Sequence, residues 1–269
     1  MNKVAVLMSV YKNDRLPFVE LAVNSVLQQT YQQFDFFIIA DGMLDKEVDD
    51  FLLKVKDNRI VLYKNKQNKG LAKSLNELLR TVLSKEYEYI ARMDADDISL
   101  PERIAKQVSF LDKHTDIDCL GTWAIEIDEK GEIFYYKKMP ETHQRCYEFF
   151  KKRDCLIHPT VMFRRRYFEV AGFYPEDTYF AEDTMMWAKG FVKGCRFANV
   201  PDFLFKFRLN KDFFKRRRGW KHAMEIYKLR KKVNRMLQYP ISANCYAVLY
   251  ALAKLMPTSI LNIIYKTSR

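Results

Sequence analysis

The chain contains few cysteines, and their spacing matches neither a disulfide framework nor a zinc site. There are five among 269 residues, an odd number, and no two of them form a C-x-x-C pair. Scattered single thiols are typical of proteins that fold in the reducing cytosol, where disulfides do not persist. The sequence therefore predicts a cytoplasmic protein that depends on neither disulfides nor zinc.

Long apolar runs are lacking as well. The first ten residues, M-N-K-V-A-V-L-M-S-V, hold too short an apolar run and no small-residue cleavage site, so we interpret them as a strand rather than a signal peptide. Residues 243–256 have only Asn244 and Lys254 as polar residues. This segment is too short to span a bilayer, which takes roughly 20 apolar residues.

Apolar residues are nevertheless plentiful, and positive charge gathers near one end. The chain is 48% hydrophobic and 14% aromatic, with a formal charge of +12. This composition supports a real core in one large or two small domains. Residues 202–235 hold 13 Lys or Arg against 3 Asp or Glu, a net of +10, which leaves about +2 for the rest.

The first hundred residues alternate predicted strands with predicted helices. We expect strands over 4–9, 34–40, 59–63 and 87–93, and helices over 17–29, 46–55 and 70–83. This alternation predicts right-handed βαβ units and a parallel sheet. A predicted hairpin over 117–128 and 132–137 adds antiparallel strands, so we expect a mixed, mostly parallel sheet flanked by helices.

An acidic cluster ends the last of these strands. The sequence Y87-E-Y-I-A-R-M-D-A-D-D97 passes from an apolar run to three carboxylates. On an extended backbone Asp94 and Asp96 face one point while Asp97 turns elsewhere. Two such oxygen ligands suit Mg²⁺ or Mn²⁺ together with substrate phosphates. The alternative is a solvated acidic loop that caps the helix beginning at Pro101.

Parallel sheets bind ligands beyond the carboxyl ends of their strands. The segments Ser9 to Asn13, Asp41-Gly42 and Arg92 to Asp97 each follow or end a predicted strand. We therefore expect these three distant segments to line one crevice.

Several ordered motifs together resemble those of glycosyltransferase family 2. They are S9-V-Y-K, A40-D-G, N68-K-G-L-A-K-S-L-N76, I90-A-R-M-D-A-D-D-I-S-L-P-E-R103, H158-P-T and F180-A-E-D-T-M-M-W187. The resemblance covers about residues 3–210 and is to bacterial enzymes that extend lipid-linked capsule, exopolysaccharide or O-antigen units. It implies the A-type glycosyltransferase fold, a nucleotide-sugar donor with UDP as the expected nucleotide, a divalent metal, and inversion at the sugar carbon.

The resemblance assigns roles around the acidic cluster. Asp96 matches the direct metal ligand, and Asp94 matches the residue near the ribose or the metal's water shell, with Ala95 between them. Arg92 is placed to hold donor phosphate or sugar hydroxyls with its fork of donors. Alternatively, Arg92 pairs with Asp94 or Asp96 and holds the loop.

The resemblance also assigns the nucleotide contacts. Asp41 matches the residue that pairs with the base, and Ser9, Val10 and Tyr11 are expected to offer backbone groups to it. This sequence has A-D-G-M where the family commonly has D-D-G-S, which leaves the nucleoside open, and a simple Asp-Gly turn is the alternative for Asp41.

Gly70, Lys73 and Asn76 match a family stretch at a helix start. Free N–H groups and positive potential there suit a diphosphate. A plain glycine-containing helix entry is the alternative.

Glu182-Asp183 matches the family's acidic pair, in which the Asp is the catalytic base and Glu182 would orient acceptor or donor hydroxyls. A carboxylate near the acceptor hydroxyl can take its proton. The alternative is that both acids favour the first turn of a helix. Trp187 either stacks on a sugar or packs in the core, and His158 either approaches the phosphates or is structural.

The basic and apolar C-terminal part, residues 211–269, is expected to dock on a membrane. Lys215 to Arg218 precede the apolar segments, and exposed Lys and Arg favour an anionic cytoplasmic leaflet. We therefore predict a peripheral protein on the inner face of the cell membrane that does not bind nucleic acid. The alternative is a solvated helix with a core-packed hairpin. Residues 1–210 would form the catalytic domain, with a nucleotide-binding half over 1–100 and an acceptor half over 101–210.

Three classes of function stay open at this point. The first is a metal-dependent inverting glycosyltransferase with a saccharide or lipid-linked oligosaccharide acceptor. The second is a metal-dependent nucleotidyltransferase, although the loop Val10 to Pro17 lacks the glycines that such enzymes usually carry. The third is a basic module that binds membrane or nucleic acid without catalysis.

Overall fold

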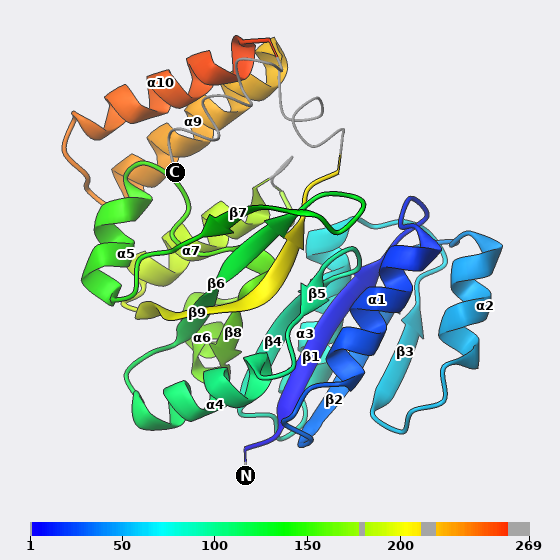
Figure 1. The fold of residues 1–269 in the computed structure, drawn as a ribbon. Coiled ribbons are helices and arrows are strands. Elements are labelled where there is room, and N and C mark those ends of the chain that lie inside the picture. The colour runs from blue at the N-terminus through cyan, green and yellow to red at the C-terminus, as the bar shows by residue number, and fades with distance from the viewer. Residues whose placement is uncertain (1, 178–180, 211–218, 258–269) are drawn as a thin grey trace.

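A mixed β-sheet runs through the middle of the molecule (Figure 1). The computed structural model describes residues 2–177, 181–210 and 219–257. The basic cluster Lys215 to Arg218 and residues 258–269, both in the part expected to dock on a membrane, lie outside the described residues.

The sheet has the strand order β3-β2-β1-β4-β8-β6-β9-β5, and β7 pairs with β6. Its strands are β1 Val4–Val10, β2 Phe34–Ala40, β3 Ile60–Lys64, β4 Tyr89–Asp94, β5 Ile98–Ser99, β6 Cys119–Ile127, β7 Ile133–Lys137, β8 Met162–Arg164 and β9 Phe197–Arg208. The first four strands are parallel, whereas β8 runs antiparallel to β4 and β6. The predicted mixed, mostly parallel sheet is therefore confirmed.

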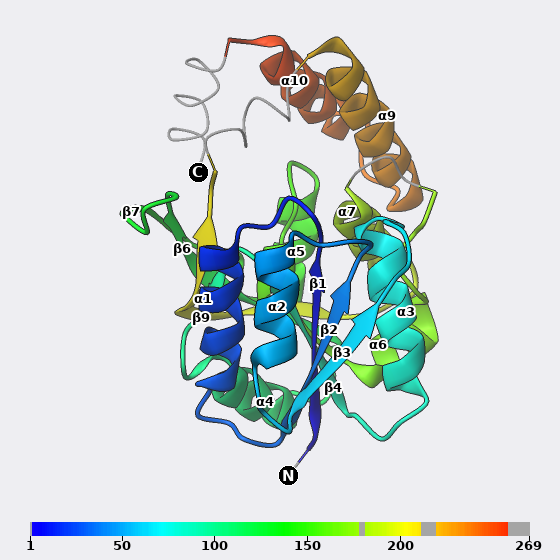
Figure 2. The same cartoon turned by 90° about the vertical axis from the view of Figure 1, so that its right-hand side faces the viewer.

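Helices cover both faces of the sheet (Figure 1, Figure 2). They are α1 Leu16–Leu27, α2 Lys46–Lys54, α3 Leu71–Leu83, α4 Arg103–Lys113, α5 His143–Phe150, α6 Arg165–Ala171 and α7 Glu182–Val192, with a 3₁₀ turn, η1, over His158–Thr160. Ala5 and Leu7 of β1 join the core that α3, α5, α6 and α7 cover, while Val6 and Met8 join the core beneath α1, α2 and α4. Burial of both faces explains the near-continuous apolar run of β1.

Two long helices follow β9 in the described part of the chain. They are α9 Trp220–Met236 and α10 Ala243–Leu255. They lie side by side beyond the end of the sheet to which β1 points (Figure 1, Figure 2). Val233 and Leu237 are buried in the same core as α5 and α7. Within the described residues, neither these nor any other helix combines the length and apolar character needed to cross a bilayer.

Most predicted elements agree with the structure to within about two residues, but several features differ. The pattern predicts none of α5, β5 and β9, and β9 depends on pairing with the distant strand β6. In addition, β4 ends at Asp94 and residues 95–96 form a turn. The alternation expected for an extended backbone is therefore wrong for Asp96, because the chain turns there to reach β5.

Gly190 lets α7 approach its neighbours closely. A Cβ atom there would lie 2.6 Å from the Tyr167 hydroxyl and 2.7 Å from the Phe197 ring. We expect Gly190→Ala to lower the free energy of unfolding by about 1–3 kcal/mol, measured by urea denaturation. Lys189→Ala, at a partly exposed position of the same helix, is the control. Equal stability of the two variants would show that this contact is not tight.

Candidate active site

The register of the parallel strands brings the predicted segments together. Ser9 lies opposite Asp94 on neighbouring strands, and Val10 lies opposite Ala40. The backbone N–H of Asp41 donates to the carbonyl of Val10 at 2.7 Å. Ser9 to Tyr11, Asp41 and Asp94 therefore share one edge of the sheet, as the topology predicts.

The acidic turn after β4 is held by Arg208, the last residue of β9. Its backbone N–H donates to Asp97 Oδ1 at 2.7 Å, and its Nε donates to the carbonyl of Asp96 at 2.7 Å. Its Nη1 donates to the carbonyl of Asp128 at 2.9 Å. Asp97 is fully buried, and burial, followed by the charges of Asp96 and Asp94, raises the pKa of its carboxyl well above the ordinary value. The sequence pattern did not identify Arg208, because nothing local indicates that β9 ends beside this turn.

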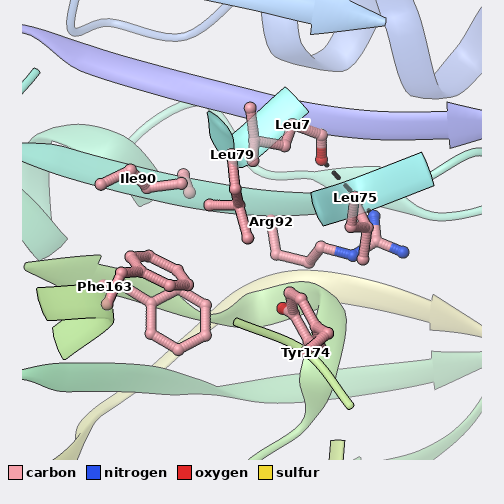
Figure 3. A pocket seen from close by; sticks show the side chains of 9 residues that line it. Leu7, Leu75, Leu79, Ile90, Arg92, Phe163 and Tyr174 are labelled. Carbon is pink, nitrogen blue, oxygen red and sulfur yellow. Dashed lines mark hydrogen bonds between the residues drawn. The ribbon is translucent and has the colours of Figure 1, made fainter. Parts of the chain in front are cut away.

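Arg92 lies two residues before Asp94 in β4, and its side chain is almost completely buried. Its guanidinium pairs with the Asp94 carboxylate and donates to the carbonyl of Met93. The carbonyl of Leu7 lies 3.4 Å from Nη1 (Figure 3). The structure thus shows the pairing with Asp94 that was the alternative for Arg92, and contact with donor phosphate or sugar hydroxyls stays a prediction. A cavity of about 10 Å³ beside Arg92 and Tyr174 is otherwise apolar. It is far too small for a nucleotide sugar.

Asp14, in the loop after β1, faces the same acidic turn. Its carboxylate accepts a hydrogen bond from the backbone N–H of Tyr11 at 2.8 Å. Burial, together with the charges of Asp96 and Asp94, raises the pKa of Asp14 to about 7 against the lowering effect of the Tyr11 hydrogen bond. Asp14 was not among the predicted site residues. The only sequence feature that points to Asp14 is its position in the loop after a predicted strand.

The carboxylate of Asp41 is buried and engaged by the loop that precedes α3. The backbone N–H groups of Lys69 and Gly70 donate to its two oxygens at 2.8 and 2.9 Å. Gly42 has φ +90°, as an Asp-Gly turn requires. The structure therefore shows the turn that was the alternative for Asp41, and pairing with a base stays a prediction.

Asn76 holds the segment that leads to α7. Its buried side chain donates to the carbonyl of Tyr174 at 2.9 Å and accepts from the Tyr174 N–H at 3.0 Å. It also donates to the Glu176 carboxylate at 2.8 Å. The hydrogen bond from Asn76 is the largest cause of the lowered pKa of Glu176. Lys73 is exposed on the same helix, and its charge also lowers this pKa. Asn76 thus contacts the chain before α7 rather than the edge of β4.

Glu182 and Asp183 form the first turn of α7. The preceding residue, Ala181, has φ 59° and ψ 40°, a left-handed conformation that is uncommon for a residue other than glycine and costs free energy. Asp183 Oδ1 accepts the backbone N–H of Thr184 at 2.7 Å. This left-handed residue thus lies directly before the two carboxylates.

Tyr174 lies between the two halves of the site. Burial raises the pKa of its hydroxyl, the charge of Arg92 lowers it, and Glu182 and Asp183 contribute to raising it. Nε2 of His158 lies 2.8 Å from this hydroxyl. Burial, and then the charge of Arg92, lowers the pKa of His158 well below its ordinary value. His158 is therefore neutral at pH 7 and shares a hydrogen bond with Tyr174.

Trp187 belongs to the core. Its side chain is 0% exposed, and its ring lies 5.9 Å from that of Phe163 and 6.0 Å from that of His158, centroid to centroid. The structure thus shows the alternative in which Trp187 packs, and a sugar cannot reach its face.

The carboxylates at the edge of β4 fit a divalent ion shared with a substrate. No group of three His, Cys, Asp or Glu side chains that could hold a metal alone occurs within residues 2–177, 181–210 and 219–257. Mg²⁺ and Mn²⁺ bound to nucleotides need only one or two carboxylates, because phosphates and water complete the shell. Burial is the largest cause of the raised pKa of Asp14, and the charges of Asp96 and Asp94 add to it, so these three carboxylates lie close enough to interact. A cation among them would offset that repulsion.

Comparison with known proteins gives concordant matches. A sequence model described as "Glycosyl transferase family 2" matches residues 5–172, which ends before Glu182. The chain is 29% identical to "Amylovoran biosynthesis glycosyltransferase AmsE" of Erwinia amylovora, over 98% of each protein. It is 27% identical to the "UDP-Gal:alpha-D-GlcNAc-diphosphoundecaprenol beta-1,3-galactosyltransferase" of Escherichia coli, over 98% of this chain and 95% of that one.

A solved structure shows the same architecture. Mannosyltransferase PcManGT from Pyrobaculum calidifontis, in complex with GDP-Man and Mn²⁺, superimposes with a TM-score of 0.66 at 17% identity. The superposition covers 98% of this chain and 79% of that one. The expected A-type glycosyltransferase fold is therefore confirmed.

The raised pKa of Asp14 predicts a pH-dependent stability. Between its ordinary value of 3.8 and its folded value of about 7, the folded state keeps a proton that the unfolded state has lost, so stability from this group falls as pH rises. Asp14→Asn retains an acceptor for the Tyr11 N–H but cannot ionise. Without divalent ions, the melting temperature of the variant minus that of the wild type should rise between pH 4 and pH 7 and level off above. A difference that does not change with pH would contradict this assignment.

Proposed function

This chain belongs to glycosyl transferase family 2, and we propose that it moves a sugar from a nucleotide-sugar donor to a saccharide hydroxyl with inversion at the sugar carbon. The observation that carries this proposal is the convergence of Ser9 to Tyr11, Asp41 and the acidic turn on one edge of the sheet. The charges of Arg92, at this edge, and of Glu182 and Asp183 all act on the buried hydroxyl of Tyr174. Family membership favours sugar transfer over nucleotidyl transfer and over binding without catalysis.

The donor would lie along the edge of β1, β2 and β4. Backbone groups of Ser9, Val10 and Tyr11, with Asp41, would receive the base, while Gly70 and Lys73 at the start of α3 would face the diphosphate. We propose UDP as the nucleotide, supported by the UDP-Gal donor in the name of the E. coli relative. The fold itself also accepts GDP-Man, as in the archaeal mannosyltransferase, so the base is set by side chains rather than by architecture.

Asp96 and Asp94 would hold Mn²⁺ or Mg²⁺. The Mn²⁺ in the archaeal mannosyltransferase of the same fold supports this assignment. When bound, such an ion neutralises charge on the departing nucleoside diphosphate. The contribution of this chain is to position the ligands, because Arg92 pairs with Asp94 and Arg208 fixes the backbone of Asp96.

Asp183 would act as the catalytic base. The acceptor oxygen bonds to the sugar carbon as the bond to the donor phosphate breaks, and the acceptor proton passes to the Asp183 carboxylate. The hydrogen bond from the Thr184 N–H and the strained residue Ala181 would hold this carboxylate in place. Glu182 would orient acceptor or donor hydroxyls beside it.

We propose that the acceptor is a lipid-linked saccharide of bacterial surface polysaccharide synthesis. The support comes from the names of two relatives, which refer to amylovoran biosynthesis and to transfer to a diphosphoundecaprenol-linked sugar. Such an acceptor places the protein in the cytoplasm, peripherally on the inner face of the membrane. Residues 1–210 would then be the catalytic unit, and residues 211–269 would dock.

The metal assignment predicts the effect of Asp96→Ala. Loss of a direct ligand should abolish activity that depends on Mn²⁺, while the melting temperature without metal stays nearly unchanged because Asp96 lies in a turn. The measurement is release of nucleoside diphosphate with increasing Mn²⁺. Asp116→Ala, which removes an exposed ion pair with Arg196, is the control. Full turnover by the Asp96 variant would reject the site.

The base assignment predicts the effect of Asp183→Asn. The amide keeps the size of the side chain and an acceptor for the Thr184 N–H, yet it cannot take a proton. Donor affinity should persist, while kcat for transfer falls roughly 100-fold or more. Calorimetric donor binding and steady-state kinetics separate the two quantities. If donor affinity falls while kcat does not, Asp183 is a binding residue instead.

A further inference from the structure

The half of α10 that faces away from α9 is apolar. Tyr246, Val248, Leu249, Leu252 and Leu255 are between 40% and 62% exposed, and we call them the α10 outer face. Their spacing of about three to four residues places them on one side of the helix. On the opposite side, Ala243 and Ala247 are buried. A row of exposed apolar side chains without a charge among them needs a partner.

Lys152 borders this face, and further positive charge lies on the neighbouring helix α9. Residues 219–257 contain seven Lys or Arg and one acid, Glu225. Lys228, Lys231, Lys232 and Arg235 are exposed on α9. Lys152 of the catalytic part lies 5.1 Å from the ring of Tyr246. An apolar helix face flanked by lysines is typical of helices that lie in the interface of an anionic bilayer.

We propose that the α10 outer face inserts into the surface of an anionic lipid bilayer, with the lysines of α9 and Lys152 against the lipid headgroups. Nucleic acid fits less well, because the exposed side of α10 is apolar rather than basic. A second copy of the chain also fits less well, since a twofold contact through α10 would bring two units of net charge +6 together.

Buried contacts tie the docking helices to the candidate active site. Arg230 of α9 is buried, and its Nη2 pairs with Asp154 Oδ1 at 2.9 Å. The same oxygen accepts the hydroxyl of Thr184 at 2.8 Å, and Thr184 follows Asp183 directly. Tyr147 and Tyr239 add hydrogen bonds of 2.8 and 2.7 Å between α5 and the chain after α9. The α9–α10 pair is therefore fixed relative to the first turn of α7.

The placement of this pair suits a membrane-bound substrate. The helices lie beyond the end of the sheet to which β1 points, where the candidate site is also found (Figure 1, Figure 2). Docking through α10 would hold the site close to the bilayer surface. The advantage of such docking, which is access to a lipid-linked acceptor, rests on the proposed function. Attachment to the bilayer itself does not, because it requires no sugar transfer.

The test measures binding of the full chain to vesicles of phosphatidylcholine, alone or mixed with phosphatidylglycerol, without donor or metal. The variant Leu249→Asp with Leu252→Asp should bind mixed vesicles roughly tenfold more weakly than the wild type, because charged side chains replace inserted apolar ones. Leu53→Asp on α2 is the matched control, since Leu53 is 60% exposed and Leu249 is 62% exposed. Urea denaturation checks that each variant folds.

A second variant separates charge from insertion. Replacing Lys228, Lys231 and Lys232 with Ser should weaken binding at low salt and have less effect at high salt, because exposed charges are screened over about 8 Å at physiological ionic strength. The effect of the Leu249 and Leu252 substitutions should persist at high salt.

Four outcomes would overturn the proposal. The first is equal vesicle binding by the leucine variant and the wild type, and the second is a wild type that shows no preference for anionic vesicles. The third is a wild-type dimer that the leucine substitutions dissociate. The fourth is a wild type that binds DNA, with substitutions that weaken its binding to DNA and not its binding to vesicles. Transfer to a water-soluble acceptor should be unchanged in the leucine variant. If the wild type itself transfers no sugar, the proposed function fails while the vesicle result still decides the docking surface.

Discussion

Repulsion among carboxylates at the carboxyl end of β4 is the constraint on which the rest of the site depends. Asp94, Asp96 and Asp97 are three of the four residues at positions 94–97, and Asp14 faces them from the loop after β1. Two arginines interact with this cluster. Arg92 pairs with the Asp94 carboxylate, and Arg208 donates to the backbone carbonyl of Asp96. Burial raises the pKa values of Asp14 and Asp97, and the charges of Asp96 and Asp94 raise them further. A divalent ion bound to a diphosphate would offset the remaining negative charge of these carboxylates.

The two halves of the site are joined by polar side chains rather than by packing alone. Asn76 clamps the backbone of Tyr174, whose hydroxyl contacts His158 and lies near Arg92 and the α7 acids. A second chain of contacts runs from Arg230 through Asp154 to Thr184. Because each buried polar group needs its partner, these two connections restrict where Asp183 can lie. The position of the first turn of α7 thus depends on α3 and on α9, which are distant in sequence.

Local patterns predicted much of this arrangement. The alternation of apolar runs and helical periodicity placed β1 to β4 and α1 to α3, and the topology of parallel strands then brought Ser9, Asp41 and Asp94 to one edge. What the patterns missed depends on contacts distant in sequence. The strand β9 is specified by pairing with β6, Arg208 reaches the acidic turn only through that pairing, and Asn76 contacts Tyr174 across 98 residues.

The account is tested most directly by donor consumption across a panel of nucleotide sugars, with Mn²⁺, with Mg²⁺ or with a chelator. It predicts that one UDP-sugar is consumed in preference to the others, that UDP is released, and that the chelator stops the reaction. Consumption that proceeds equally well in the chelator would contradict a metal at the acidic turn. Consumption of no nucleotide sugar, with or without a saccharide acceptor, would contradict the proposed donor site itself.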